Sequence, residues 1–148
     1  LRYQPKVDFA VADCAFADIE NVLKTGWRYA NIPSDIFAPV NLCGKLRYGY
    51  ALSAMRPIDA LKGNAVPVFY IHGAADGFIL PVNSERLYEA TEGKKELMLV
   101  PEAGHAESVL TNPKLYATGL QEFLQSLGLI SPEEKAEPLI RRSPKTAE

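Results

Sequence analysis

Two titratable residues, Asp76 and His105, each follow an apolar segment of the chain at short range. Val66–Ile71 (VPVFYI) precedes Asp76, and Glu96–Val100 (ELMLV) precedes His105. A carboxylate that accepts a hydrogen bond from an imidazole fixes its tautomer and stabilises the imidazolium form. The other ring nitrogen can then deprotonate a hydroxyl group or a water molecule. The two residues together therefore indicate general-base chemistry, although either one alone is more often a helix cap or a surface loop residue.

The elements expected around these residues are those of a parallel sheet. Apolar runs predict strands at Val7–Ala15, Val66–Ile71 and Glu96–Val100, each suited to burial on both faces, with His72-Gly73 ending the second. Helical spacing predicts an amphipathic helix over Val82–Thr91 and another from Asn112-Pro113 to Gly128. Alternating strands and helices favour an α/β fold with three parallel strands and flanking helices. Loops at the carboxyl ends of such strands bind ligands, so Asp76 and His105 should lie at one rim.

The domain organisation follows from composition. Residues 1–130 are expected to form one α/β portion, within which residues 18–64 insert two or three short helices at the carboxyl edge of the sheet, as a cap-like cover for a site there. Several large apolar residues of this insertion could line a pocket, but burial in its own small core and against the sheet is the favoured interpretation: Trp27, Tyr29, Ile36, Phe37, Leu42, Tyr48 and Tyr50. Residues 131–148 alternate charge with proline and are expected to be disordered.

Charge and cysteine content argue against several classes of function. The 148 residues carry a formal net charge of −2, without a basic stripe for nucleic acid or for an anionic membrane, and no apolar run is long enough to span a bilayer. Cys14 and Cys43 are expected to be free, mostly buried thiols of a reducing, cytoplasmic compartment, with a single disulfide as the alternative. No cysteine and histidine have metal-ligand spacing, so neither a metal nor another cofactor is expected.

Two motifs resemble those of a known family. IHGAADGFILP, with Asp76 in it, and AGHAES, with His105 in it, are similar to the C-terminal half of α/β hydrolases, in particular bacterial esterase-like members related to the prolyl oligopeptidase and dienelactone hydrolase groups. The segment Asp13-Cys14-Ala15-Phe16 also looks like the one that follows the nucleophile helix there. The likeness extends from about Lys6 to Gly128, and it implies a partial α/β-hydrolase fold.

The resemblance implies roles for individual residues. Asp76 would be the acid and His105 the base of a catalytic triad. His72 would be structural, holding the turn through a ring nitrogen, and Asp13 is an alternative acid because it also ends a strand. Ala74 stands where many relatives carry an acidic residue, and nothing is inferred from that difference.

The family nucleophile is not recognisable in this chain. It lies in a Gly-x-Ser-x-Gly turn between a strand and a helix. No serine here has the two flanking glycines: Ser34, Ser53, Ser84, Ser108, Ser126, Ser131 and Ser143. The family order places the nucleophile and the oxyanion donors before Leu1, so the 148-residue chain alone is expected to be inactive.

The function implied for the longer protein is hydrolysis of a carboxylic ester, or less readily an amide, through an acyl-enzyme, with a small-molecule substrate. Acyl transfer to another acceptor uses the same machinery. The hypothesis from another class is a non-catalytic α/β-hydrolase-like binding or scaffold protein. Because the first predicted strand would have an exposed edge, the chain is also expected to self-associate.

Overall fold

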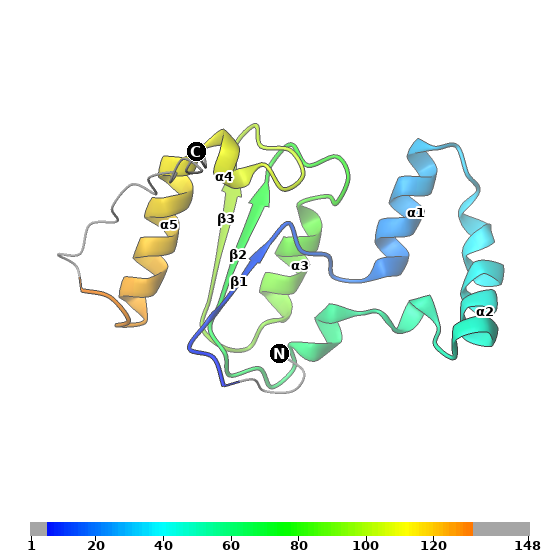
Figure 1. Ribbon diagram of the computed structural model, residues 1–148, viewed down its shortest axis with the longest axis horizontal. Coiled ribbons are helices and arrows are strands. Elements are labelled where there is room, and N and C mark those ends of the chain that lie inside the picture. Colours follow the sequence, from blue (N-terminus) through cyan, green and yellow to red (C-terminus); the bar gives the residue numbers. More distant parts are fainter. Residues whose placement is uncertain (1–5, 132–148) are drawn as a thin grey trace, which may run out of the picture.

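A three-stranded parallel sheet is the centre of the molecule. The computed structural model describes residues 6–131 and contains β1 (Ala10–Asp13), β2 (Val68–Gly73) and β3 (Lys95–Val100) in the spatial order β1-β2-β3 (Figure 1). Both neighbouring pairs are parallel, with Asp13 opposite Ile71 and Gly73 opposite Val100. The carboxyl ends of the three strands therefore meet at one edge, as the sequence predicted.

Helices cover both faces of β2. The side chains of Val68 and Tyr70 pack in a core with Leu87 of α3 (Val82–Ala90). The intervening Phe69 and Ile71 face the opposite way and pack with Phe123 of α5 (Pro113–Ser126). Alternate residues of a strand point to opposite faces, so every residue of β2 is buried. The predicted α/β architecture with flanking helices is confirmed.

The helix boundaries agree with the local signals in the sequence. The Asn112 side chain accepts a hydrogen bond from the Leu115 N–H, and Pro113 occupies the first turn of α5. Gly128 follows that helix with φ of +72°, in the left-handed region that ends helices. A one-turn helix, α4 (Ser108–Thr111), precedes α5. Together these elements fix the segment that follows β3.

The first strand differs from its prediction in length and burial. Only Ala10–Asp13 of the expected Val7–Ala15 is strand, and Val11 is 38% exposed. The prediction of a strand buried on both faces is wrong because, within residues 6–131, β1 pairs with β2 alone and is an edge strand. The second strand is longer at its end than expected, since His72 and Gly73 still pair with Leu99 and Val100.

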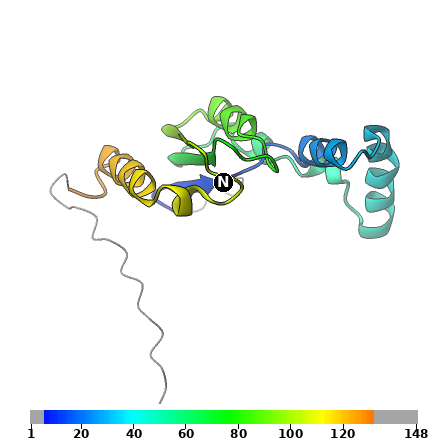
Figure 2. The ribbon, with the colours of Figure 1, turned by 90° about the horizontal axis from the view of Figure 1, so that it is seen from above.

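Residues 18–64 lie between β1 and β2 and are largely helical. They contain α1 (Ile19–Tyr29) and α2 (Phe37–Tyr48), with single 3₁₀ turns at Ser34–Ile36, Leu52–Ala54 and Pro57–Ala60. Asp18 caps α1 by accepting the Asn21 N–H at 2.8 Å. Figures 1 and 2 show α1 and α2 extending to one side of the sheet, away from the loop between β3 and α4. Within residues 6–131, these two helices lie beside the sheet, and a cap-like role for the insertion stays a prediction.

The apolar residues of the insertion are mostly exposed. Phe37 is buried and packs against Trp27, with ring centroids 6.2 Å apart. Four other large side chains that were expected in a small core are exposed to solvent instead: Tyr29, Leu42, Tyr48 and Tyr50. The prediction is wrong for these residues because α1 and α2 pack on few other elements and each leaves a broad face uncovered.

Other sequence-based expectations have separate outcomes. Cys14 and Cys43 are free thiols as predicted, but only Cys14 is buried. Within residues 6–131, no helix has both the length and the apolar character needed to cross a membrane. The predicted disordered tail, apart from Ser131, lies outside the described residues.

Candidate active site

Asp76 and His105 are in direct contact. The Nδ1 atom of His105 lies 2.9 Å from the Oδ2 atom of Asp76. Asp76 follows β2 and His105 follows β3, so two consecutive loops at the carboxyl edge bring the residues together. Asp76 is buried, whereas the side chain of His105 retains 38% exposure. The structure thus joins the two residues that the sequence singled out.

Backbone amides complete the environment of Asp76. Its Oδ1 atom accepts the N–H groups of Phe78 and Ile79, each at 2.9 Å. Burial alone would raise the pKa of Asp76, but the hydrogen bonds from His105, Ile79 and Phe78 together lower the pKa below its usual value. The side chain is therefore held as a carboxylate in a fixed orientation.

This lowered pKa predicts how stability depends on pH. Since the folded-state pKa of Asp76 lies below its unfolded value, its stabilising contribution is complete above the ordinary aspartate range, about pH 4, and disappears as the pH falls through the folded-state pKa. Wild-type protein and the Asp76→Asn variant should thus differ most in free energy of unfolding at neutral pH. Urea titrations at several pH values measure this difference, and a difference that stays constant into acid would contradict the prediction.

His105 has one ring nitrogen available for chemistry. With Nδ1 donating to Asp76, neutral His105 carries an unprotonated Nε2, which has no hydrogen-bond partner among residues 6–131. The ring of Phe78 packs edge-on against the imidazole, with centroids 5.0 Å apart and an interplanar angle of 67°. Nε2 is therefore placed to accept a proton from a group that reaches the rim.

His72 is buried in the turn after β2, in agreement with a structural role. Its Nε2 lies 2.7 Å from the carbonyl oxygen of Ile79, and its Nδ1 lies 2.6 Å from the Oγ atom of Ser84. A carbonyl oxygen only accepts hydrogen bonds, so Nε2 carries the proton and the Ser84 hydroxyl donates to Nδ1. His72 therefore ties the loop of Asp76 to α3.

One group of donor atoms has the spacing of a metal site. Within the described residues, Cys14, His72 and Asp76 each place one such atom within 4.8 Å of the others. These atoms are already engaged, however. His72 Nε2 donates a hydrogen bond to the carbonyl oxygen of Ile79, and Cys14 Sγ accepts the N–H of Ala106 at 3.3 Å. A metal ion would have to displace these bonds, so the donor set fits the hydrogen-bonded arrangement better.

Asp13, the alternative acid, has other partners. Its Oδ1 atom accepts hydrogen bonds from Ser108 Oγ at 3.2 Å and from the Cys14 thiol at 3.3 Å. His105 pairs with Asp76 instead. Ser108 is fully buried and directed at Asp13, which is not the position of an exposed nucleophile.

Sequence reasoning did not assign roles to several neighbours of the pair. Phe78 contacts His105, Cys14 accepts the N–H of Ala106, and Ser108 donates to Asp13. The position of Phe78, two residues after Asp76, is the signal in the sequence that places it near the pair. The links from Cys14 and Ser108 had no signal in the sequence, because their partners are more than ninety positions away.

Gly73, the last residue of β2, provides space for the loop of His105. A Cβ atom at this position would collide with the carbonyl oxygens of Ala103 and Gly104. Because both colliding atoms belong to the backbone, Gly73→Ala should displace the loop and lengthen the contact between His105 and Asp76. The expected measurement is loss of the hydrogen-bonded His105 Nδ1–H signal in NMR spectra. Gly26→Ala, where a Cβ meets nothing within 4 Å, is the matched control.

The fold corresponds to part of the α/β-hydrolase fold seen in esterases. An esterase of Pyrococcus furiosus superimposes on 82% of this chain with a TM-score of 0.59 and 19% identity, using 46% of its own length. Acetyl xylan esterase 1 from Thermoanaerobacterium covers 88% of this chain and 40% of its own length, with a TM-score of 0.57 and 15% identity. A thermophilic esterase from Thermogutta terrifontis covers 84% and 58%, with a TM-score of 0.54 and 15% identity.

Sequence similarity connects the chain to one curated protein. The uncharacterized protein YqkD of Bacillus subtilis is 34% identical over 122 residues, which are 81% of this chain and 40% of YqkD. The chain thus spans less than half the length of this relative. No protein-family model matches the sequence.

Proposed function

We propose that these residues form the acid and base part of a serine esterase whose nucleophile lies on a polypeptide segment outside the 148 residues. The observation that carries the proposal is the His105–Asp76 contact of 2.9 Å, with the second ring nitrogen of His105 lacking a hydrogen-bond partner among residues 6–131. The esterase fold of the structural relatives supports a hydrolase of this kind. Fold alone does not specify the reaction, so the site geometry is the primary support.

The proposed reaction is two-step acyl transfer to water. The serine hydroxyl attacks the ester carbonyl while His105 Nε2 takes its proton, and the resulting imidazolium gives that proton to the departing alkoxide. Water then attacks the acyl-enzyme with His105 again as base, which releases the acid and restores the serine. Asp76 orients the imidazole and stabilises its charged form throughout. The mechanism uses no metal ion or organic cofactor.

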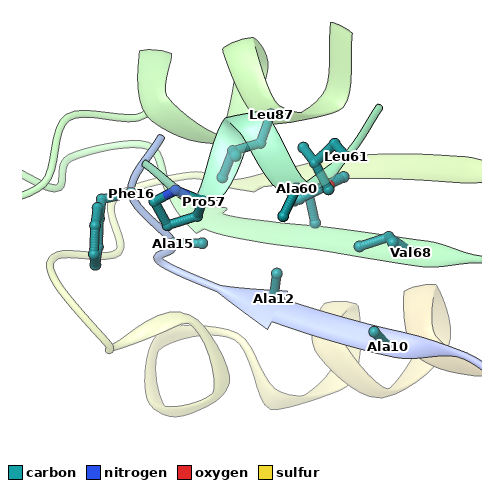
Figure 3. Close-up of a pocket in the computed structure, with 10 residues that line it drawn as sticks. Ala10, Ala12, Ala15, Phe16, Pro57, Ala60, Leu61, Val68 and Leu87 are labelled. Atoms are coloured by element: carbon teal, nitrogen blue, oxygen red, sulfur yellow. The ribbon is translucent and has the colours of Figure 1, made fainter. Parts of the chain in front are cut away.

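The open side of β1 is where we place the segment that bears the serine. A hollow of about 480 Å³ lies on the α3 side of this strand, lined almost entirely by apolar side chains (Figure 3). Ala10 and Ala12 of β1 form one wall, with Ala60 and Leu61 opposite. Small side chains let another element approach closely, and parallel strands are normally covered on both faces. These features suit a sheet that continues beyond β1.

The serine can be tested by sequencing and labelling. The reading frame that precedes Leu1 should encode a Gly-x-Ser-x-Gly motif, and the longer protein should react with a fluorophosphonate probe at that serine. The 148-residue chain alone should not be labelled. An uninterrupted upstream frame without the motif, or stoichiometric labelling of the 148-residue chain, would contradict the proposal.

The same open edge predicts self-association of the isolated chain. Unpaired strand groups next to an apolar hollow can pair with a second copy. We therefore expect dimers or larger species in sedimentation velocity experiments. Val11→Lys, at an exposed position of β1, should shift the distribution toward monomer, whereas Lys62→Arg on the exposed surface should not. A monodisperse wild-type monomer would contradict this prediction.

A further inference from the structure

The carboxyl end of β1 is bonded to the loop that carries His105. Asp13 is the last residue of the strand, and its Oδ1 atom accepts the hydroxyl of Ser108 at 3.2 Å. The following residue, Cys14, accepts the N–H of Ala106 on its Sγ atom at 3.3 Å. The two residues that donate these bonds, Ala106 and Ser108, are the first and the third residues after His105 along the chain.

A third side chain joins the same cluster. Tyr116, on α5, lies near the Asp13 carboxylate, and burial together with the charge of Asp13 raises the pKa of Tyr116. Ser108 is fully buried. If the Asp13 carboxylate were removed, the Ser108 hydroxyl would lose its hydrogen bond and could not replace it with one to water. Since an unsatisfied buried polar group is costly, the bond from Ser108 to Asp13 holds the start of α4 at the end of β1.

The backbone on both sides of these contacts is turned sharply. Cys14 has φ of +50° and Ala106 has φ of +57°, both in the left-handed region that residues other than glycine rarely adopt. Such conformations persist only where surrounding bonds enforce them. The bond between Ala106 N–H and Cys14 Sγ links the two turns directly, while Cys14 is itself anchored by its N–H on the Ile71 carbonyl at 2.9 Å.

We propose that Asp13, with Cys14 beside it, is a positioning residue for His105. Asp76 fixes the imidazole through Nδ1 from the end of β2, and the Asp13 cluster fixes the backbone that follows His105 from the end of β1. The imidazole is thereby held from two strands at once. This inference rests on the proposed function only in taking His105 as the base, and it gives Asp13 a task different from that of an alternative acid.

The experiment is NMR spectroscopy of the full 148-residue chain, which contains only two histidines. The readouts are the His105 Nδ1–H resonance, assigned through the His105→Gln variant, and amide exchange at Ala106. Asp13→Ala should abolish the resonance and speed the exchange by about ten-fold or more, as expected for loss of a hydrogen bond to a charged group. Asp13→Asn keeps an acceptor oxygen and should restore both readouts.

Two further variants separate positioning from general loss of stability. Leu61→Ala removes a buried side chain from the core on the α3 side and should leave both readouts near wild type although the protein is less stable. Ser108→Ala removes only the donor and should speed Ala106 exchange by about three-fold; it provides the test if Asp13→Ala does not fold.

Several results would overturn the inference. These are unchanged readouts in both Asp13→Ala and Ser108→Ala, equal losses in Asp13→Asn and Asp13→Ala, or losses in Leu61→Ala as large as those in Asp13→Ala. Failure of the proposed function has a different signature: the serine-bearing protein would not react with the fluorophosphonate, while the dependence of the His105 resonance on Asp13 would remain.

Discussion

Replacing Asp76 with asparagine is expected to lower the kcat of the proposed serine esterase by about 10⁴-fold with little change in KM, as in catalytic triads that lose the acid. The asparagine amide cannot accept the Nδ1–H while its oxygen holds the Phe78 and Ile79 amides. His105 would then be driven toward the tautomer with its proton on Nε2, which cannot act as a base. Hydrolysis of a chromogenic nitrophenyl ester measures the effect.

The matched control for this variant is Asp59→Asn. Asp59 is exposed and pairs with Arg56 on the surface, so the same loss of charge should leave kcat within about two-fold of wild type, because exposed ion pairs contribute little. A kcat for Asp76→Asn within ten-fold of wild type would show that Asp76 is not the orienting acid.

Replacing Phe123 with alanine is expected to destabilise the chain by about 3–5 kcal/mol. The Phe123 ring is fully buried, stacks on Phe69 with centroids 5.2 Å apart and meets Phe9 edge-on at 6.3 Å. Its loss leaves a cavity between α5 and the sheet. Because domains of this size are typically stable by only about 5–15 kcal/mol, the urea midpoint should fall steeply and α5 should detach from the sheet.

Leu46→Ala is the control for the effect of burial. Leu46 lies on α2 and is 78% exposed, so its truncation should change the free energy of unfolding by no more than about 0.5 kcal/mol. Equal midpoints for Phe123→Ala and wild type would mean that α5 does not pack on the sheet as the structure shows.

Much of the fold was predictable because local signals agreed with one another. The apolar run through Phe69 and Ile71 predicted a buried strand, and the Asn112-Pro113 pair predicted the start of α5. The pairing of Asp76 with His105 followed from topology, since consecutive parallel strands end at the same edge. The burial of β1 was mispredicted, because an edge strand and a central strand can have similar sequences. Only the position of the neighbouring strands distinguishes them.

The details of the site beyond that pair were not predictable for a related reason. Phe78 follows β2 and His105 follows β3, so their ring contact depends on how the two loops meet. Asp13 and Cys14 meet Ser108 and Ala106 across more than ninety residues. No spacing in the sequence encodes such a contact, which exists only because β1 and the loop after β3 meet at the same edge of the sheet.

The sequence by itself determined the order of strands and helices, the identity of the carboxylate and the imidazole, and the edge at which they stand. These properties depend on side-chain periodicity and chain direction, which are local. The tertiary structure alone decided that β1 is an edge strand among residues 6–131, that α1 and α2 lie beside the sheet, and that the loop of His105 is bonded to both Asp76 and the end of β1. These features depend on which segments pack against one another, and those segments are far apart in the sequence.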